Sequence, residues 1–305
     1  MNLPEIIDHT QAYYCLDCGI CTGSCPVSRT TPDFSPRLMV EKVLIEEIEN
    51  PFEDINIWSC LSCGQCSERC PSNIDYPEFV RLVREEAVRL GKSAVPAHRG
   101  LFQTVMRLQS MNVRQSKTQW AREIGKVSES GDTYFFVGCS PFFDVEFHDD
   151  WGLDMMDSPK GALKLMNSIG IEPVVHDDER CCGHDLLWNG DKANFAKLAQ
   201  KNVELIRKLG CKRVVFSCPE GYMTFNKYYP EIVGELGFET VHFYELLAAE
   251  AASGKVSFSE LDGVFTYHDP CRLGRQAGIF DAPRNLLTSI PGLKLKEMPH
   301  NRESG

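Results

Sequence analysis

The sequence has no run of apolar residues long enough to cross a lipid bilayer, so we expect no membrane-spanning segment. Its first residues, Met-Asn-Leu-Pro-Glu, lack the basic and apolar parts of a secretory signal peptide. Positive charge is also scarce: 32 Lys and Arg against 43 Asp and Glu give a formal net charge of −11, which argues against nucleic acid as a partner. We therefore expect a cytoplasmic chain that reaches the inner face of a membrane only through a partner.

Glycine-rich loops for binding dinucleotides or phosphates are missing as well, so any flavin or nicotinamide has to come from another chain. Cysteine, in contrast, is abundant. The 14 cysteines in 305 residues are too many for an ordinary cytosolic enzyme, which points to metal binding. The length is sufficient for two domains with cores of their own.

Eight of the cysteines form two matching runs, one over residues 15–25 and one over 60–70, each with the pattern C-x-x-C-x-x-C-x-x-x-C-P. Structural zinc usually takes pairs of C-x-x-C knuckles, and disulfides need an oxidising compartment, so we favour two [4Fe–4S] clusters. Bacterial two-cluster ferredoxins have this spacing, and in them the fourth cysteine of each run binds the other run's cluster. The expected ligand sets are Cys15, Cys18, Cys21 and Cys70 for one cluster, and Cys60, Cys63, Cys66 and Cys25 for the other.

Helices are expected around these runs. Ser35-Pro36 reads as the start of a helix that ends near Asn50-Pro51, and Tyr76-Pro77 as the start of another that stops at Gly91. Residues 98–124 continue as an amphipathic helical stretch. A small bacterial ferredoxin has no room for the helix between the runs, so the pattern favours a helical ferredoxin arrangement.

Some side chains near the runs allow two interpretations. Tyr13, Tyr14 and Trp58 precede the first cysteines of the runs, where they would either shield a cluster from water or simply pack in the core. The basic residues of the helix after Tyr76 would either dock an acidic partner or, as we expect, form a solvated face. These basic residues are Arg81, Arg84, Arg89 and Lys92.

After a polar segment at 126–132 the pattern changes to strands alternating with helices, which predicts a parallel α/β layer. The expected strands are Thr133–Val137, a segment around 173–175, Arg213–Phe216, Thr240–Phe243 and Val264–Tyr267. The expected helices include 160–169 and a long one from Asp191 to Gly210.

Three of these strands are followed directly by a cysteine, namely Cys139, Cys218 and Cys271. Open α/β sheets bind ligands at the carboxyl ends of their strands, and a loop with Cys181-Cys182-Gly183 could reach the same edge. We expect a third metal centre there, with the glycine letting the backbone pass close to a bulky inorganic group. Isolated core cysteines are the alternative, and for Cys211 a buried structural thiol is the favoured interpretation.

A lone Cys139, then Cys181-Cys182-Gly183, then Cys218 resembles the CCG cysteine-rich module of heterodisulfide reductases. With the ferredoxin runs in front, the whole chain resembles a fusion of the C and B subunits of that family, as in its D subunit. The resemblance implies an iron–sulfur oxidoreductase subunit that passes electrons between the ferredoxin clusters and a CCG cluster. It implies as partners a flavoprotein of the heterodisulfide reductase A type or a membrane cytochrome. A pure electron relay from a flavoprotein to quinone or another redox protein is the alternative.

Two departures from the family pattern matter. The full module ends in C-x-x-C, but Gly221 stands at its last position, which leaves four cysteines and suits an ordinary [4Fe–4S] cube. Cys271 looks like the opening of a second CCG module, whose cluster would form only if the natural chain continues past Gly305. His184, His268 and Asp269 lie beside these cysteines, where they would relay protons or simply support the loops.

The resulting prediction is an N-terminal α-helical ferredoxin domain followed by a CCG α/β domain with a mainly parallel sheet. We expect the ferredoxin domain at 1–125, the first CCG module at 132–255 and the start of an incomplete second module at 256–305. Two clusters are expected in the ferredoxin domain and a third in the first CCG module.

Overall fold

The computed structural model describes residues 1–44, 55–94 and 96–305, which form two compact units. The first unit comprises Met1–Gln103, Asp185–Lys192 and Arg302–Gly305, and the second comprises Thr104–His184 and Ala193–Asn301. The N-terminal segment of the first unit runs to Gln103, whereas the sequence suggested a boundary at 126–132. The side chains of Gln109 and Lys117 explain this difference, because they bond to residues of the cysteine-rich unit.

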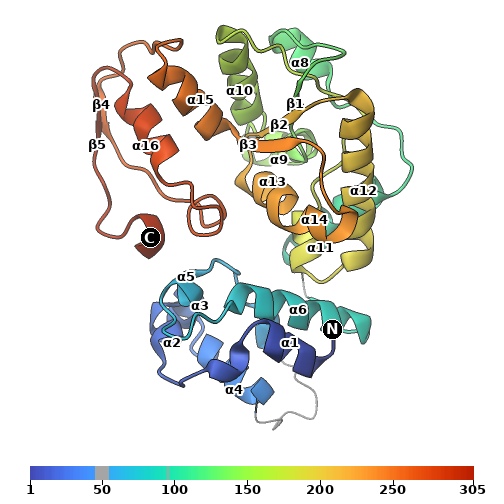
Figure 1. Ribbon diagram of the computed structural model, residues 1–305, viewed down its shortest axis with the longest axis vertical. Helices are drawn as coiled ribbons and strands as arrows, with labels where there is room; N and C mark the ends of the chain where they lie inside the picture. The colour runs from blue at the N-terminus through green and yellow to red at the C-terminus, as the bar shows by residue number, and fades with distance from the viewer. Residues whose placement is uncertain (45–54, 95) are drawn as a thin grey trace. The chain divides into compact units, whose positions relative to one another are not determined.

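Helices alone build the first unit over its described residues (Figure 1). Its core is formed by α1, α4 and α6 with the loops between them, and several of the run cysteines pack against that core. This confirms the helical arrangement expected around the runs. The helical elements of this unit are α1 (Leu3–His9), η1 (Ala12–Tyr14), α2 (Ile20–Ser24), α3 (Pro26–Thr30), α4 (Pro36–Leu44), η3 (Ile55–Trp58), α5 (Gln65–Glu68), α6 (Tyr76–Arg89), η4 (Ala97–Gly100), α11 (His184–Trp188) and η6 (Arg302–Ser304).

The set of side chains that helix α6 buries differs from the predicted set. Asp75 caps it by accepting a hydrogen bond from the Glu78 amide at 3.1 Å. Arg81 and Arg84, expected on a solvated face, are both buried, whereas the apolar Leu90 is 47% exposed. Arg81 is buried because it pairs with the carboxylate of Glu78, and Arg84 because it bonds to backbone carbonyls. Helix α4 begins at Pro36 as predicted, and its predicted end lies outside the described residues.

The second unit is built on a parallel sheet of β1 (Thr133–Phe136), β2 (Arg213–Phe216) and β3 (Glu239–His242), in the order β1-β2-β3. Phe136 pairs with Phe216, and Phe216 with His242, so the three strands end together. The expected strand around 173–175 is reduced to isolated bridges from Val174 to Ser128 and Tyr134. The mainly parallel sheet predicted for this part is confirmed.

Apolar side chains on both faces explain why the strands read as continuous hydrophobic runs. Phe135 and Val215 face a core with α10 (Asp157–Ser168) and α15 (Phe243–Ala252). On the other face Phe136 and Phe216 contact the ring of Phe225 at centroid distances of 4.8 and 4.9 Å. Phe225 belongs to a nearly continuous helical segment made of α13 (Pro219–Met223), the π-helical η5 (Thr224–Tyr228) and α14 (Tyr229–Val233).

The helical stretch predicted over 98–124 is interrupted. It consists of α7 (Leu101–Ser110) and α8 (Gln119–Ile124), because the amides of Lys117 and Thr118 bond to the carboxylate of Asp177 instead of continuing a helix. The remaining long helices are α9 (Ser140–Trp151), α12 (Lys192–Leu209) and α16 (Asp281–Thr288). Across the described ranges, no helix is both long and apolar enough to cross a membrane.

A second, two-stranded parallel sheet follows, made of β4 (Gly263–Phe265) and β5 (Leu293–Leu295). The strand before Cys271 therefore belongs to a different sheet from those before Cys139 and Cys218. The expectation that all three cysteines meet at one sheet edge is wrong for Cys271, because β4 pairs with β5 and not with β1–β3.

Candidate metal centres

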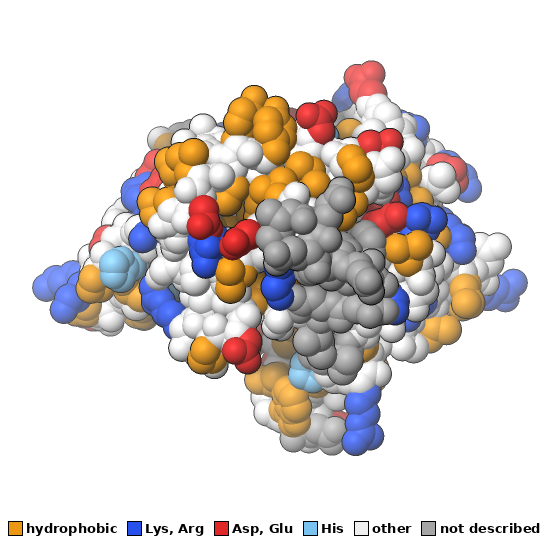
Figure 2. All heavy atoms as spheres, turned by 90° about the horizontal axis from the view of Figure 1, so that it is seen from below, with side chains coloured by type: hydrophobic (Ala, Val, Ile, Leu, Met, Phe, Trp, Pro, Cys, Tyr) orange, Lys and Arg blue, Asp and Glu red, His pale blue; other side chains and the backbone are white. Residues whose placement is uncertain are grey.

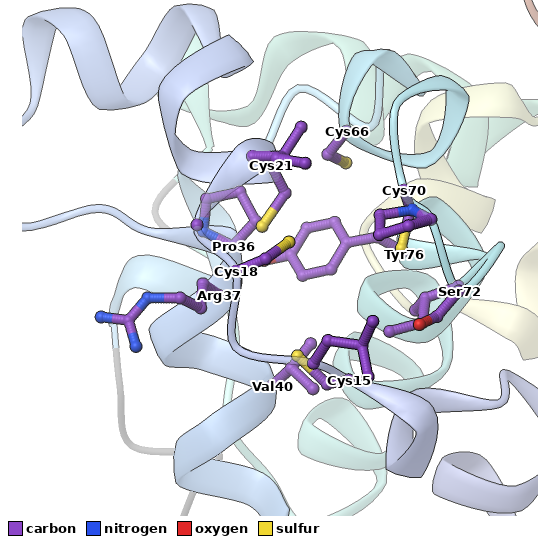
Figure 3. Close-up of a pocket in the computed structure, with 15 residues that line it drawn as sticks. Cys15, Cys18, Cys21, Pro36, Arg37, Val40, Cys66, Cys70, Ser72 and Tyr76 are labelled. Atoms are coloured by element: carbon purple, nitrogen blue, oxygen red, sulfur yellow. The ribbon is translucent and has the colours of Figure 1, made fainter.

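The first cysteine-lined cavity lies between the loop of the first run and the end of the second (Figure 3). It contains about 460 Å³ of empty space, part of which is open to solvent. It is lined by all four cysteines expected to bind the first cluster, and also by Cys66. These four are Cys15, Cys18, Cys21 and Cys70.

The second cavity, with an empty volume of about 320 Å³, lies between the loop of the second run and the end of the first. Its lining includes all four cysteines expected to bind the second cluster, namely Cys25, Cys60, Cys63 and Cys66. In each cavity three cysteines of one run thus lie with the fourth cysteine of the other run.

The two runs adopt the same backbone conformation. Asp17 and Ser62, just before the second cysteine of each run, have φ of 52° and 47°, and Gly19 and Gly64, just after it, have φ of 76° and 81°. Two left-handed residues around one cysteine curl the chain, so that three thiols line the same cavity. The sequence carries this signal in the repeated pattern Cys-Leu-x-Cys-Gly, which the spacing of cysteines alone does not use.

The cavities suit a cluster better than a single ion. A zinc ion needs all of its sulfur ligands about 2.3 Å from one point. Among the described residues, no three Cys, His, Asp or Glu side chains meet in that way. Thiols that are distributed around a cavity fit a polynuclear iron–sulfur core better than they fit a single ion. Burial raises the pKa of Cys60 to about 11, with the nearby Arg84 guanidinium opposing the rise, so a bound cation would hold these thiols as thiolates.

Arg84 is the buried side chain that fixes the second loop from behind. Its guanidinium donates to the carbonyl oxygens of Ile57 at 2.8 Å, Cys60 at 2.7 Å and Trp188 at 3.0 Å. The guanidinium carbon also lies 5.6 Å from the ring of Trp58. Trp58 and the half-exposed Tyr13 and Tyr14 are not among the residues that line either cavity.

The four cysteines of the first CCG module are held by the sheet edge and a buried loop. Cys139 follows β1 and directly precedes α9, and Cys218 follows β2 and directly precedes α13. Because β1 and β2 are parallel and in register, both lie at the same edge. Contact with the Cys181 thiol and burial raise the pKa of Cys182, and the Cys218 and Cys139 thiols raise it further. The other three thiols are therefore within electrostatic reach of the Cys182 thiol.

The backbone of the Cys-Cys pair is fixed by polar side chains from three helices. The Cys181 amide donates to Gln109 of α7 at 2.8 Å, and Asn202 of α12 donates to the Cys181 carbonyl at 3.1 Å. Tyr229 donates to the Cys182 carbonyl at 3.0 Å and accepts from Asn202 at 3.0 Å. Sequence reasoning missed Asn202 and Tyr229, because both sit inside otherwise apolar helical patterns.

The structure shows why residue 183 is a glycine. Its φ is +81°, and a Cβ there would lie 3.0 Å from Phe195 and 3.1 Å from Leu198. The glycine is thus required by a left-handed backbone and by close packing on α12, which is an observed reason that does not involve approach to an inorganic group.

A buried ion pair holds the loop before Cys139. Lys117 and Glu179, with side chains 4% and 3% exposed, lie 2.7 Å apart. Glu179 accepts from the Gly138 amide at 2.8 Å, while Lys117 donates to the Gly138 carbonyl at 2.7 Å. Both polar groups of Gly138, next to the expected ligand, are therefore bound by this pair.

The remaining candidates are not part of the two groups described above. Cys211 is buried at the opposite end of β2 from Cys218, in keeping with a structural thiol. Cys271 lies in the turn after β4. Asp269 is buried in a bidentate pair with Arg284 at 2.7 and 2.8 Å, which argues against it as a proton donor, whereas His268 is exposed. His184 begins α11 beside the Cys-Cys pair.

Comparison with known proteins matches both parts of the chain. Residues 11–74 match the model of the 4Fe-4S dicluster domain, and residues 133–226 and 265–305 match that of the cysteine-rich domain CCG. The stretch 265–305 begins at the last residue of β4 and covers Cys271 and β5, where the sequence suggested the start of a second module.

Three curated relatives illustrate the similarity. The chain is 31% identical over 201 residues to the D subunit of the dihydromethanophenazine:CoB–CoM heterodisulfide reductase of Methanosarcina barkeri, covering 63% of this chain and 46% of that protein. It is 31% identical over 159 residues to the EtfAB:quinone oxidoreductase of Syntrophomonas wolfei, covering 52% and 21%. It is 26% identical over 293 residues to the B subunit of the fumarate reductase (CoM/CoB) of Methanothermobacter marburgensis, covering 93% and 56%.

The chain spans about half the length, or less, of these relatives. The dicluster domain and the cysteine-rich domain nevertheless occur in it in the order expected from the sequence. The chain thus carries a 4Fe-4S dicluster domain and a CCG cysteine-rich domain, and it is similar to iron–sulfur oxidoreductase subunits that include the D subunit of heterodisulfide reductase.

Proposed function

We propose that the chain transfers electrons within a larger redox complex, between two ferredoxin-type [4Fe–4S] clusters and a third cluster in the first CCG module. The observation that carries this proposal is the pair of adjoining cavities, each lined by three cysteines of one run and the fourth of the other. When bound, the clusters supply one-electron redox chemistry. The protein would bind them, set their potentials and exclude water.

The proposed ligands of the third cluster are Cys139, Cys181, Cys182 and Cys218. Cys181 and Cys182 are buried and Cys139 and Cys218 are half-buried, which would limit the access of water to the centre. Cys271 is proposed as a ligand of a further cluster, separate from these three. It takes no part in the three-cluster proposal.

The exposed surface beside the runs supports electron exchange with another protein of the complex. Cys18 is exposed, and the residues next to the first cysteine of each run, Leu16 and Leu61, are 68% and 61% exposed. Figure 2 shows hydrophobic side chains interspersed with charged ones on the face seen from below. We propose a flavoprotein or a membrane cytochrome as the partner, in line with the absence of a dinucleotide-binding loop.

Two functions remain to be distinguished, a catalytic subunit and a pure electron relay. They differ in whether the third centre reduces a substrate. The fumarate reductase and heterodisulfide reductase relatives are named for reactions that consume electrons, which favours a catalytic role. Glycine at position 221 removes the fifth cysteine of the full module, which favours an electron relay with no substrate chemistry of its own.

Electron transfer is tested by reducing the intact, anaerobically purified protein with a viologen and following each cluster by EPR. Stepwise reduction of all three clusters, with the third reduced through the other two, is expected. If the third cluster has a higher potential than the two ferredoxin clusters, it should become reduced once they are. A third cluster that then stays oxidised would contradict the proposal. Turnover of a disulfide substrate by the same protein would rule out the pure relay.

A further inference from the structure

The two cysteine-lined cavities have three of the described residues in common, namely Pro36, Cys66 and Tyr76. Pro36 has no polar side chain, and Cys66 belongs to the second ligand set. Tyr76 is thus the one shared residue that offers a hydroxyl to a bound group.

The position of Tyr76 is fixed from the backbone outward. It is the first residue of α6, and its amide donates to the Ile74 carbonyl at 2.9 Å and to the Ser67 hydroxyl at 3.0 Å. Ser67 follows Cys66 directly and donates in turn to the Ile74 carbonyl at 2.8 Å. The tyrosine and the cysteine loop are therefore held together by three hydrogen bonds.

The phenol itself is buried with an unsatisfied hydroxyl. Tyr76 is only 4% exposed, and its ring packs 5.8 Å from that of Phe79. Among the described residues its Oη has no hydrogen-bond partner. Buried polar atoms are rarely left in this state, and those that are call for an explanation such as a missing ion or ligand. Figure 3 shows the ring extending between Cys18 and Cys21 on one side and Cys70 on the other.

The segment that holds Tyr76 indicates which centre its hydroxyl serves. The Tyr76 amide is bound to Ser67, which directly follows Cys66, a ligand of the second set. Pro77, the next residue of α6, lines the second cavity and is not in the lining of the first. The hydroxyl is therefore placed to donate a hydrogen bond towards the second cavity.

We propose that the Tyr76 hydroxyl donates an O–H···S hydrogen bond to the second cluster and thereby raises its reduction potential above that of the first. This inference rests on the proposed binding of two clusters in the first unit. Hydrogen bonds to cluster sulfurs are among the factors that set the potential, and they are stronger in the reduced, more negative state. A higher potential at the second cluster would direct electrons from the first to the second.

The test is an anaerobic redox titration of the protein and its Tyr76→Phe variant, followed by EPR. Loss of the hydroxyl is expected to lower the potential of one cluster by about 59 mV, the equivalent of a tenfold change in its oxidised-to-reduced ratio for one electron. The other cluster should not move. Tyr14→Phe, which removes a half-exposed hydroxyl beside the first run, is the matched control and should shift neither. Cys63→Ser, which removes a ligand of the second set, identifies the signal of that cluster.

A second readout is independent of the variant's stability. Proton ENDOR of the reduced wild-type protein should detect a strongly coupled proton on the second cluster that exchanges in D₂O. That proton should be missing in Tyr76→Phe. Absence of such a proton in the wild type, or equal potentials in wild type and variant, would overturn the inference while leaving the clusters in place. Iron analysis showing fewer than two clusters in the wild type would instead refute the proposed function.

Discussion

Arg84 donates a hydrogen bond to the carbonyl oxygen of Cys60 over 2.7 Å, so a buried cation sits directly behind an expected cluster ligand. The same guanidinium holds Ile57 and Trp188 through their carbonyls. Two consequences follow for the second centre. Its loop depends on this side chain for its position, and the positive charge favours the reduced, more negative form of the cluster.

Arg84→Met should therefore lower both stability and potential. Three carbonyls lose a charged donor, which costs about 3 kcal/mol or more of unfolding free energy. The potential of the second cluster should fall, and Arg84→Lys should be intermediate because it keeps the charge but not the planar fork. Urea unfolding and a redox titration measure the two effects. Arg89→Met on the same helix, where the side chain is 67% exposed, is the control and should change little. An unchanged potential in Arg84→Met would show that the charge does not act on the cluster.

Glu179→Gln should selectively disturb the centre in the cysteine-rich unit. The change leaves Lys117 buried without its partner carboxylate, and breaking such a pair typically costs about 3–5 kcal/mol. The loop that carries Cys139 loosens, so the third cluster should be lost or become labile while the two others persist. Iron content and EPR of each cluster test this. Glu172→Gln breaks an exposed pair with Lys126 and should leave all clusters intact.

Substitutions of the two cysteines that flank β2, Cys211 and Cys218, should have different effects on the third cluster. Cys218→Ser should abolish the third cluster, because it removes a proposed ligand at the sheet edge. Cys211→Ser should retain it and cost only the stability of a small buried side chain. Equal iron contents in the two variants would contradict the assignment of Cys218.

Gly221→Cys should be accommodated without loss of stability. A Cβ at this position would lie 3.4 Å from the Phe216 ring and 3.9 Å from the Cys218 Cβ, which are ordinary contacts. Replacing a helical glycine also recovers up to about 1 kcal/mol of helix propensity. The new thiol, beside Cys218, should change the EPR spectrum of the third centre. Gly183→Ala is the contrasting variant. Its positive φ and its contact with Phe195 predict a clear loss in the thermal unfolding midpoint.

Much of this architecture could be predicted from short-range patterns. Proline within the first two helical positions marked the start of α4 and α6, and buried apolar runs marked β1 and β2. The cysteine spacing also grouped the thiols as the two cavities do. These features depend on residues close together in the chain.

The features that could not be predicted depend on long-range contacts. Arg84 looked like a solvated residue because its carbonyl partners lie up to 104 positions away. Asn202 and Tyr229 meet the Cys-Cys pair only after three helices have packed. The separate pairing of β4 with β5, which removes Cys271 from the first sheet, likewise depends on a segment beyond it in the chain.

The central claim is that twelve cysteines hold three clusters, and counting iron tests it most directly. Anaerobically reconstituted protein should contain about twelve iron atoms and as many acid-labile sulfides per chain, four for each of three clusters. The double variant Cys181→Ser/Cys182→Ser should contain about eight, with both ferredoxin EPR signals unchanged. About eight iron atoms in the wild type, with no loss in the variant, would contradict a cluster in the cysteine-rich unit.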